Sequence, residues 1–96
     1  MSDPVLTGRC YCGAVRLEAS AAPRVVSYCH CADCRRWTGA PVAAFAAFSP
    51  SALTGLDLDA GRSHAPGVTR WICAACGSPL ASHFVYLQDQ IFVPLG

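Results

Sequence analysis

Residues 10–13 read Cys-Tyr-Cys-Gly and residues 73–77 read Cys-Ala-Ala-Cys-Gly, and these two segments decide the fold. Each holds two thiols two or three residues apart, a spacing at which both sulfur atoms can reach one ion on a turn. Each also ends in a glycine, which can take a positive φ and turn backbone N–H groups toward the thiolates, as in a zinc knuckle. We therefore predict that Cys10, Cys12, Cys73 and Cys76 form one closed site of two rigid knuckles.

A third cluster lies between these segments and reads Cys-His-Cys-Ala-Asp-Cys over residues 29–34, with Arg35 rather than a glycine after it. Seven cysteines cannot all pair as disulfides, and tight clusters are typical of metal ligands. Zinc is the expected ion, because it favours four ligands in a tetrahedron and accepts thiolates readily. We expect two ions per chain.

Seven cysteines divide naturally into four and three. A closed site of four cysteines is structural, whereas a site of three leaves one position open for water or substrate. The sequence thus predicts an open second site at Cys29, Cys31 and Cys34. The alternative is that His30, Asp33 or His83 completes this site and that both ions are structural.

Composition limits the classes of protein that remain. The chain has 96 residues, of which 53% are hydrophobic and 14% charged, which indicates one small folded domain and excludes intrinsic disorder. Structural zinc supplies roughly 10–16 kcal/mol of folding free energy and would compensate for the small core. Seven thiolates and two zinc ions change the formal charge from +1 to about −2, which argues against a nucleic-acid partner.

Membrane insertion and export are not expected. The longest apolar stretch runs from Ala40 to Phe48, far short of the ~18 residues that span a bilayer. The first nine residues show no basic start followed by an apolar run, as a signal peptide would. We expect a cytoplasmic protein that binds no membrane.

Short segments between turn-forming residues predict a mainly β protein, a small zinc-stapled antiparallel β fold with few or no short helices. The expected strands are residues 14–18, 24–29, 82–86 and 90–93, and residues 42–48 are a buried strand or short helix. Residues 31–38 can form one or two helical turns, for which Asp33 is the expected N-terminal cap. Residues 49–55 and 61–67, rich in Gly, Pro and Ser, are predicted loops.

The motifs together resemble a known family. Gly-x-Cys-x-Cys-Gly-x-Val at residues 8–15, Cys-His-Cys-x-x-Cys-Arg at 29–35 and Cys-x-x-Cys-Gly-Ser-Pro-Leu at 73–80 resemble the glutathione-dependent formaldehyde-activating enzyme family, which includes the centromere protein V group. The resemblance implies a zinc-stapled fold often called a beta-tent. It also implies a structural zinc at Cys10, Cys12, Cys73 and Cys76, with the chemistry at a second zinc on Cys29, Cys31 and Cys34.

Members of that family usually continue past the segment that matches residues 90–96. We therefore expect residues 1–96 to be a single zinc-binding domain of this type, either one that lacks its C-terminal end or a naturally short member.

The resemblance implies a carbon–sulfur lyase-type reaction that joins a thiol such as glutathione to a small aldehyde such as formaldehyde. His30 is a candidate general acid, although in an extended Cys-His-Cys run its side chain points away from the two thiolates and favours a supporting role. Arg35 and Arg36 are candidates for holding a substrate carboxylate, with a solvated surface pair as the alternative.

Two other functions compete with this enzyme. The first is a non-catalytic zinc-binding module that binds a protein partner, which exposure of the apolar residues 42–48 would favour. The second is a zinc-ribbon nucleic-acid binder, which the lack of lysine and the acidic charge of the zinc-loaded protein argue against.

Overall fold

A computed structural model describes residues 6–95, which form two antiparallel sheets and one short α-helix. The smaller sheet has the strand order β1-β2-β5, and the larger has the order β3-β4-β9-β8-β7-β6. The strands of the smaller sheet are β1 (Leu6–Arg9), β2 (Arg16–Ala19) and β5 (Leu53–Thr54). Those of the larger sheet are β3 (Val25–Cys29), β4 (Ala43–Phe48), β6 (Arg62–Ala65), β7 (Val68–Ile72), β8 (Pro79–Phe84) and β9 (Ile91–Pro94).

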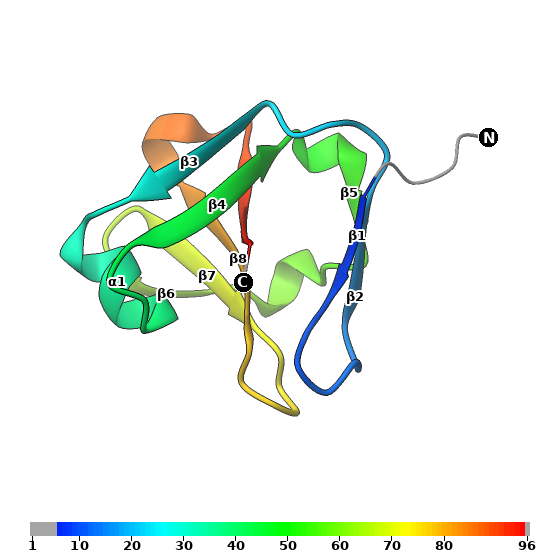
Figure 1. The fold of residues 1–96 in the computed structure, drawn as a ribbon, viewed down its shortest axis with the longest axis horizontal. Helices are drawn as coiled ribbons and strands as arrows, with labels where there is room; N and C mark the ends of the chain where they lie inside the picture. The colour runs from blue at the N-terminus through cyan, green and yellow to red at the C-terminus, as the bar shows by residue number, and fades with distance from the viewer. Residues whose placement is uncertain (1–5, 96) are drawn as a thin grey trace.

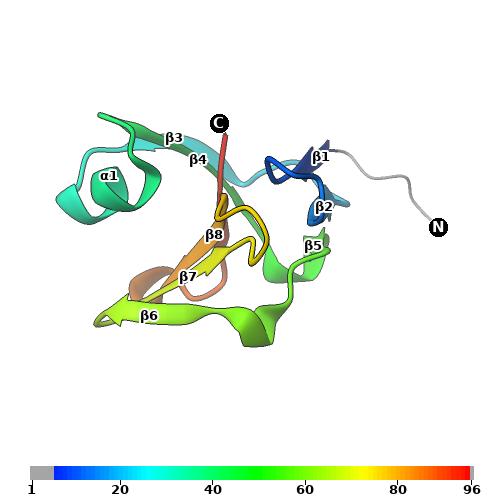
Figure 2. The same cartoon turned by 90° about the horizontal axis from the view of Figure 1, so that it is seen from below.

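The prediction of a mainly antiparallel β fold with few helices is confirmed. The helix α1 (Ala32–Thr38) lies at one end of the molecule and the three-stranded sheet at the other, as both views show (Figures 1 and 2). Three single turns of 3-10 helix complete the described elements: η1 (Pro50–Ala52), η2 (Leu58–Ala60) and η3 (Val85–Leu87). No helix within residues 6–95 is both long and apolar enough to cross a membrane.

Two clusters of buried residues lie on the two faces of β4. Alternate side chains of a strand point to opposite faces, so Ala43, Phe45 and Ala47 join a cluster with Phe84 and Phe92. The intervening side chains, those of residues 46 and 48, pack in another cluster on the other face. Of the expected segment 42–48, residues 43–48 form a strand with no exposed position, because both faces are covered.

Several element boundaries differ from the sequence-based expectation. Residues 61–67 were predicted as a loop, but β6 occupies most of this segment because it pairs with β7, with Ala65 opposite Val68. Residues 49–55 were also predicted as a loop and contain η1 and β5. The strand expected at 14–18 begins at Arg16, since a cysteine knuckle takes up the preceding residues, and the strand expected at 82–86 begins at Pro79 and ends at Phe84. Pairing between strands, which the residues of one segment alone do not show, sets these limits.

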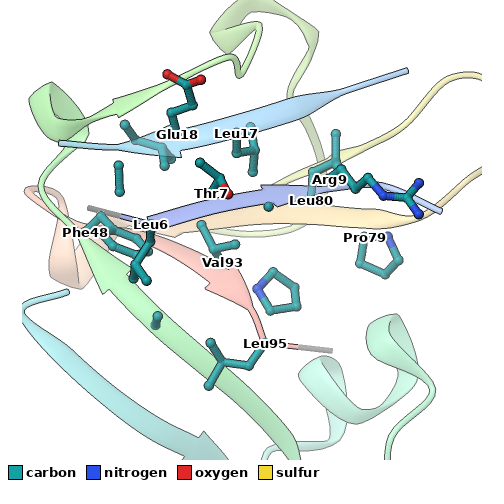
Figure 3. A pocket seen from close by; sticks show the side chains of 15 residues that line it. Leu6, Thr7, Arg9, Leu17, Glu18, Phe48, Pro79, Leu80, Val93 and Leu95 are labelled. Atoms are coloured by element: carbon teal, nitrogen blue, oxygen red, sulfur yellow. The ribbon is translucent and has the colours of Figure 1, made fainter. Parts of the chain in front are cut away.

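An apolar groove of about 280 Å³ separates the two sheets (Figure 3). Leu17 of β2 and Val93 of β9 line it from opposite sides. No cysteine lines this groove, so it is distinct from both cysteine clusters.

Candidate metal centres

The first cluster brings together the two turns that the sequence singled out. Cys10 and Cys12 lie in the β1–β2 turn, and Cys73 and Cys76 lie in the β7–β8 turn. Their four sulfur atoms lie within 4.8 Å of one another. The distance is 3.6 Å from Cys10 to Cys12 and 3.8 Å from Cys12 to Cys73. A tetrahedral zinc with Zn–S bonds of about 2.3 Å separates its sulfur ligands by about 3.8 Å, so the arrangement fits zinc.

The first knuckle turns its backbone amides toward its thiols. Gly13 has a φ of 80° and its N–H donates to the carbonyl of Cys10 (3.2 Å). The N–H of Val15 donates to Cys10 Sγ (3.3 Å), and the N–H of Ala14 donates to Cys12 Sγ (3.4 Å). The Val15 hydrogen bond lowers the pKa of the Cys10 thiol. The positive φ predicted for this glycine is confirmed.

The second knuckle repeats this design. Gly77 has a φ of 76° and its N–H donates to the carbonyl of Cys73 (2.8 Å). The hydroxyl of Ser78 lies 3.1 Å from Cys76 Sγ and lowers the pKa of that thiol to about 5. The same hydroxyl accepts the N–H of Tyr11 (2.9 Å), which joins the two knuckles. Ser78 therefore supports the Cys76 thiol as well as the contact between the knuckles.

The second cluster sits where β3 passes into α1. The sulfur atoms of Cys29, Cys31 and Cys34 lie within 4.8 Å of one another, with 3.3 Å between the first two. Cys31 is exposed, Cys29 is half-buried and Cys34 is only 1% exposed. Burial raises the pKa of Cys34 to about 12, whereas the backbone N–H of Cys34 lowers the pKa of Cys31. One side of the cluster therefore faces solvent and the other faces the core.

The cap of α1 differs from the prediction. Cys31 occupies the N-cap position, and its sulfur accepts the N–H of Cys34 (3.4 Å). Asp33 was expected in that role but forms an ion pair with Arg70. The local cap is thus a cysteine that also belongs to the three-cysteine cluster.

No described histidine or carboxylate completes the second cluster. Within residues 6–95 only cysteines belong to either group of candidate ligands. His30 is exposed, His83 Nε2 lies 3.0 Å from the carbonyl oxygen of Gln88, and Asp33 binds Arg70. The division into four and three that the spacing predicts is present in the structure, and both clusters can hold a metal ion.

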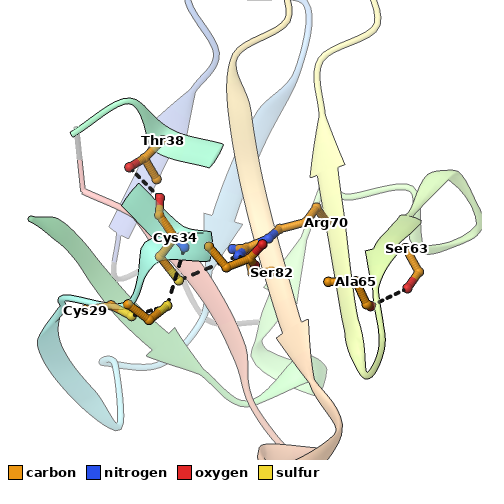
Figure 4. A network of polar contacts seen from close by, with 9 residues as sticks. Cys29, Cys34, Thr38, Ser63, Ala65, Arg70 and Ser82 are labelled. Atoms are coloured by element: carbon orange, nitrogen blue, oxygen red, sulfur yellow. Dashed lines mark hydrogen bonds and ion pairs between the residues drawn. The ribbon is translucent and has the colours of Figure 1, made fainter. Parts of the chain in front are cut away.

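Arg70 is the residue that the sequence analysis missed. Its side chain is 6% exposed and donates to Ser82 Oγ (2.7 Å), to the Asp33 carboxylate and to Cys34 Sγ (3.6 Å) (Figure 4). It also stacks on the ring of Trp37, with 4.5 Å from the guanidinium carbon to the ring centroid. The sequence feature that could have drawn attention to Arg70 is a charged residue within a strand, three positions before the Cys73 and Cys76 motif.

Two exposed cations follow the second cluster in the sequence. Arg35 and Arg36 are both exposed and follow Cys34 on α1. Arg36 lines a pocket of about 230 Å³ together with Trp37 and His64. Both arginines therefore carry an exposed positive charge close in sequence to the cluster.

The fold and its clusters define a class: a small, mainly antiparallel β protein with one four-cysteine and one three-cysteine candidate metal centre. Within that class, the chain belongs to the glutathione-dependent formaldehyde-activating enzyme family, whose model matches residues 5–96. This match confirms the resemblance seen in the motifs.

The chain is also similar to one curated protein and one solved structure. It is 29% identical over 87 residues to an uncharacterized lyase of Schizosaccharomyces pombe, an alignment that covers 91% of this chain and 62% of the relative. The chain thus spans less than two thirds of that relative. It is also similar to the crystal structure of a Rhodobacter sphaeroides protein, with a TM-score of 0.65 and 26% identity over 92% of this chain and 83% of that one.

Proposed function

We propose that this protein is a zinc-dependent carbon–sulfur lyase-type enzyme that joins a thiol such as glutathione to a small aldehyde such as formaldehyde. The observation that carries the proposal is the three-cysteine cluster, which has a solvent-facing side and no fourth ligand among the described residues. Family membership and the lyase name of the yeast relative support it.

Zinc is the cofactor in this proposal, with one ion on each cluster. Cys10, Cys12, Cys73 and Cys76 would hold the structural ion, and the three-cysteine cluster would hold the other. Four thiolates saturate a tetrahedral zinc, whereas three leave room for an external ligand. Zinc bound at the second cluster would lower the pKa of a substrate thiol.

The reaction is an addition that leaves the oxidation state unchanged. The sulfur of the ionised thiol adds to the aldehyde carbon and a C–S bond forms. The π electrons of the carbonyl move to its oxygen, which takes up one proton to become a hydroxyl. The product is an S-hydroxymethyl thioether, and the reverse reaction breaks the same bond.

Three exposed residues supply the remaining roles in the proposal. His30 lies between two of the clustered cysteines and is exposed, where it can donate the proton that the new hydroxyl requires. Arg35 and Arg36 follow the cluster on α1 and can hold the carboxylates of a glutathione-like thiol through paired hydrogen bonds. Their exposure leaves them free to do so.

The first test of the proposal is the number of zinc ions bound per chain. The same sample is then titrated with glutathione. Two zinc ions per chain are expected, with a fourth sulfur appearing at one of them in X-ray absorption. Exchange of ¹³C-labelled formaldehyde with S-hydroxymethylglutathione, followed by NMR, should be faster with the protein than with the variant Cys31→Ser. Two ions that are indifferent to glutathione, or an exchange rate equal to that of the variant, would sink the proposal.

The competing hypothesis is a non-catalytic zinc-binding module for a protein partner. The surface that would have favoured it is mostly buried. This hypothesis called for an exposed apolar surface at residues 42–48, and β4 within that segment is almost wholly buried. Only Val42 of this segment is exposed, at 40%. The competing hypothesis becomes the better one if the metal test above fails.

A further inference from the structure

Arg70 is a buried cation whose partners come from two elements, β8 and α1. Ser82 lies on β8, Asp33 and Trp37 lie on α1, and Phe84 at the end of β8 places its ring 5.5 Å from the guanidinium carbon. A buried guanidinium is tolerated only where its donors are satisfied and its charge is matched. Asp33 supplies one negative charge but is itself 53% exposed, so the solvent screens part of it.

The guanidinium also faces a candidate metal ligand. Its Nη2 atom donates to Cys34 Sγ at 3.6 Å as well as to the Asp33 carboxylate (Figure 4). Cys34 is 1% exposed, whereas Cys31 of the same cluster is exposed. Water can therefore stabilise negative charge on Cys31, but the buried sulfur of Cys34 relies on this protein cation.

Charge balance explains why a cation is useful at this place. Three thiolates around a divalent ion carry a net charge of about −1, and an incoming substrate thiolate would raise that to about −2. Within residues 6–95, Arg70 is the one cationic side chain that donates a hydrogen bond to a clustered sulfur. A hydrogen bond to a charged group is roughly twice as strong as one between neutral groups.

The position of Arg70 on β7 also connects the two clusters. Three residues further on, just past the end of β7, lies Cys73 of the four-cysteine cluster. Ser82, which holds the guanidinium, is the residue paired with Arg70 across the β7–β8 hairpin. One hairpin thus carries two ligands of the first cluster and the counter-charge of the second.

We propose that Arg70 is a positioning residue of the three-cysteine centre: it holds Cys34 in place and supplies the positive charge that lets this centre retain a metal ion. The inference deepens the proposed function and rests on it for the reaction, but metal retention tests it separately. Partners that orient metal ligands typically contribute 10–100-fold to metal affinity.

The test compares Arg70→Gln with Arg70→Lys. Glutamine keeps hydrogen-bond donors but no charge, and lysine keeps the charge without the planar fork. Zinc affinity of each centre is measured by chelator competition and cobalt spectra, with Cys31→Ser identifying the second centre. Arg24→Gln, which breaks an exposed ion pair of 2.8 Å, is the matched control.

The Gln variant should weaken the second centre alone by about 10–100-fold. Lysine should restore most of that loss, and the control should bind both ions as the wild type does. Wild-type affinity in the Gln variant, equal losses in the Gln and Lys variants, or equal losses at both centres would overturn the proposal.

If the Gln variant does not fold, Ser82→Ala replaces it, because this change removes a partner of Arg70 but no metal ligand. The Ser82→Ala variant should weaken metal binding at the second centre alone. A loss of affinity at both centres, or at neither, overturns the proposal. A wild-type protein that binds two zinc ions but does not accelerate formaldehyde exchange would sink the proposed function and leave the role of Arg70 in metal retention standing.

Discussion

Replacing one exposed cysteine in each cluster should separate a metal that holds the fold from a metal that does not. Cys12→Ser removes a thiol from the first cluster, and Cys31→Ser removes one from the second. Both side chains are exposed, so neither change leaves a cavity in the core. Serine is also a preferred N-cap, so Cys31→Ser keeps the cap of α1.

The expected difference follows from the loop that each metal closes. Cys12 and Cys73 are 61 residues apart, whereas Cys31 and Cys34 are three apart. Loop-closure entropy scales as (3/2)RT ln n, so the longer loop accounts for about 2.7 kcal/mol more than the shorter one. The three ligands of the second cluster are also near neighbours in the unfolded chain, and metal binding to the unfolded state reduces the stabilisation of the folded one.

Per ligand, a quarter of the roughly 10–16 kcal/mol of a structural zinc site is about 2.5–4 kcal/mol. Cys12→Ser should therefore lower the melting temperature by about 10–32 °C, since 1 kcal/mol shifts a domain of this size by about 4–8 °C. Cys31→Ser should lower it by only a few degrees while removing one zinc ion per chain and the exchange activity.

The assay is thermal unfolding by circular dichroism at a fixed excess of zinc, with zinc counted by native mass spectrometry. Equal losses of melting temperature in the two variants would refute the reasoning, as would a Cys12→Ser protein as stable as the wild type.

Three further changes test separate parts of the structure. Ser78→Ala removes the hydroxyl that lowers the pKa of Cys76, so that pKa rises. Protons then compete with the metal of the four-cysteine cluster at a higher pH. The pH midpoint of zinc release on acidification, followed with a zinc-sensitive dye, should therefore rise. An unchanged midpoint would argue against this role of Ser78. Arg36→Gln should raise the KM for the thiol by about tenfold with little change in kcat, since a lost carboxylate contact of about 1.4 kcal/mol is made equally in the ground and transition states; steady-state kinetics that show a fall in kcat alone would contradict it. Gly55→Ala should destabilise the protein by at least 1–2 kcal/mol, because the φ of 98° is unfavourable for alanine and the added Cβ would lie 2.0 Å from a carbonyl oxygen. Gly8→Ala, where a Cβ meets no atom within 4 Å, is its control in urea unfolding and should change stability far less.

Local sequence patterns predicted the helix α1 but missed the strand β6. The helical turns expected at residues 31–38 are α1, because a short polar segment ended by Gly39, with a φ of 75°, is a local signal. The strand β6 was missed, since its polar residues alone do not favour a strand and only pairing with β7 makes them one. The N-cap was assigned to Asp33 on residue preference, but its ion pair with Arg70 is a contact across 37 residues.

The sequence by itself determined the two cysteine clusters and their division into four and three. Ligand spacing and the positive φ of Gly13 and Gly77 are local properties that no distant contact needs to supply. Only the tertiary structure decided which side of the second cluster is buried and which cation stands behind it. The Arg70 side chain reaches from β7 to Cys34 on α1 across 36 residues, and no local pattern encodes such a contact.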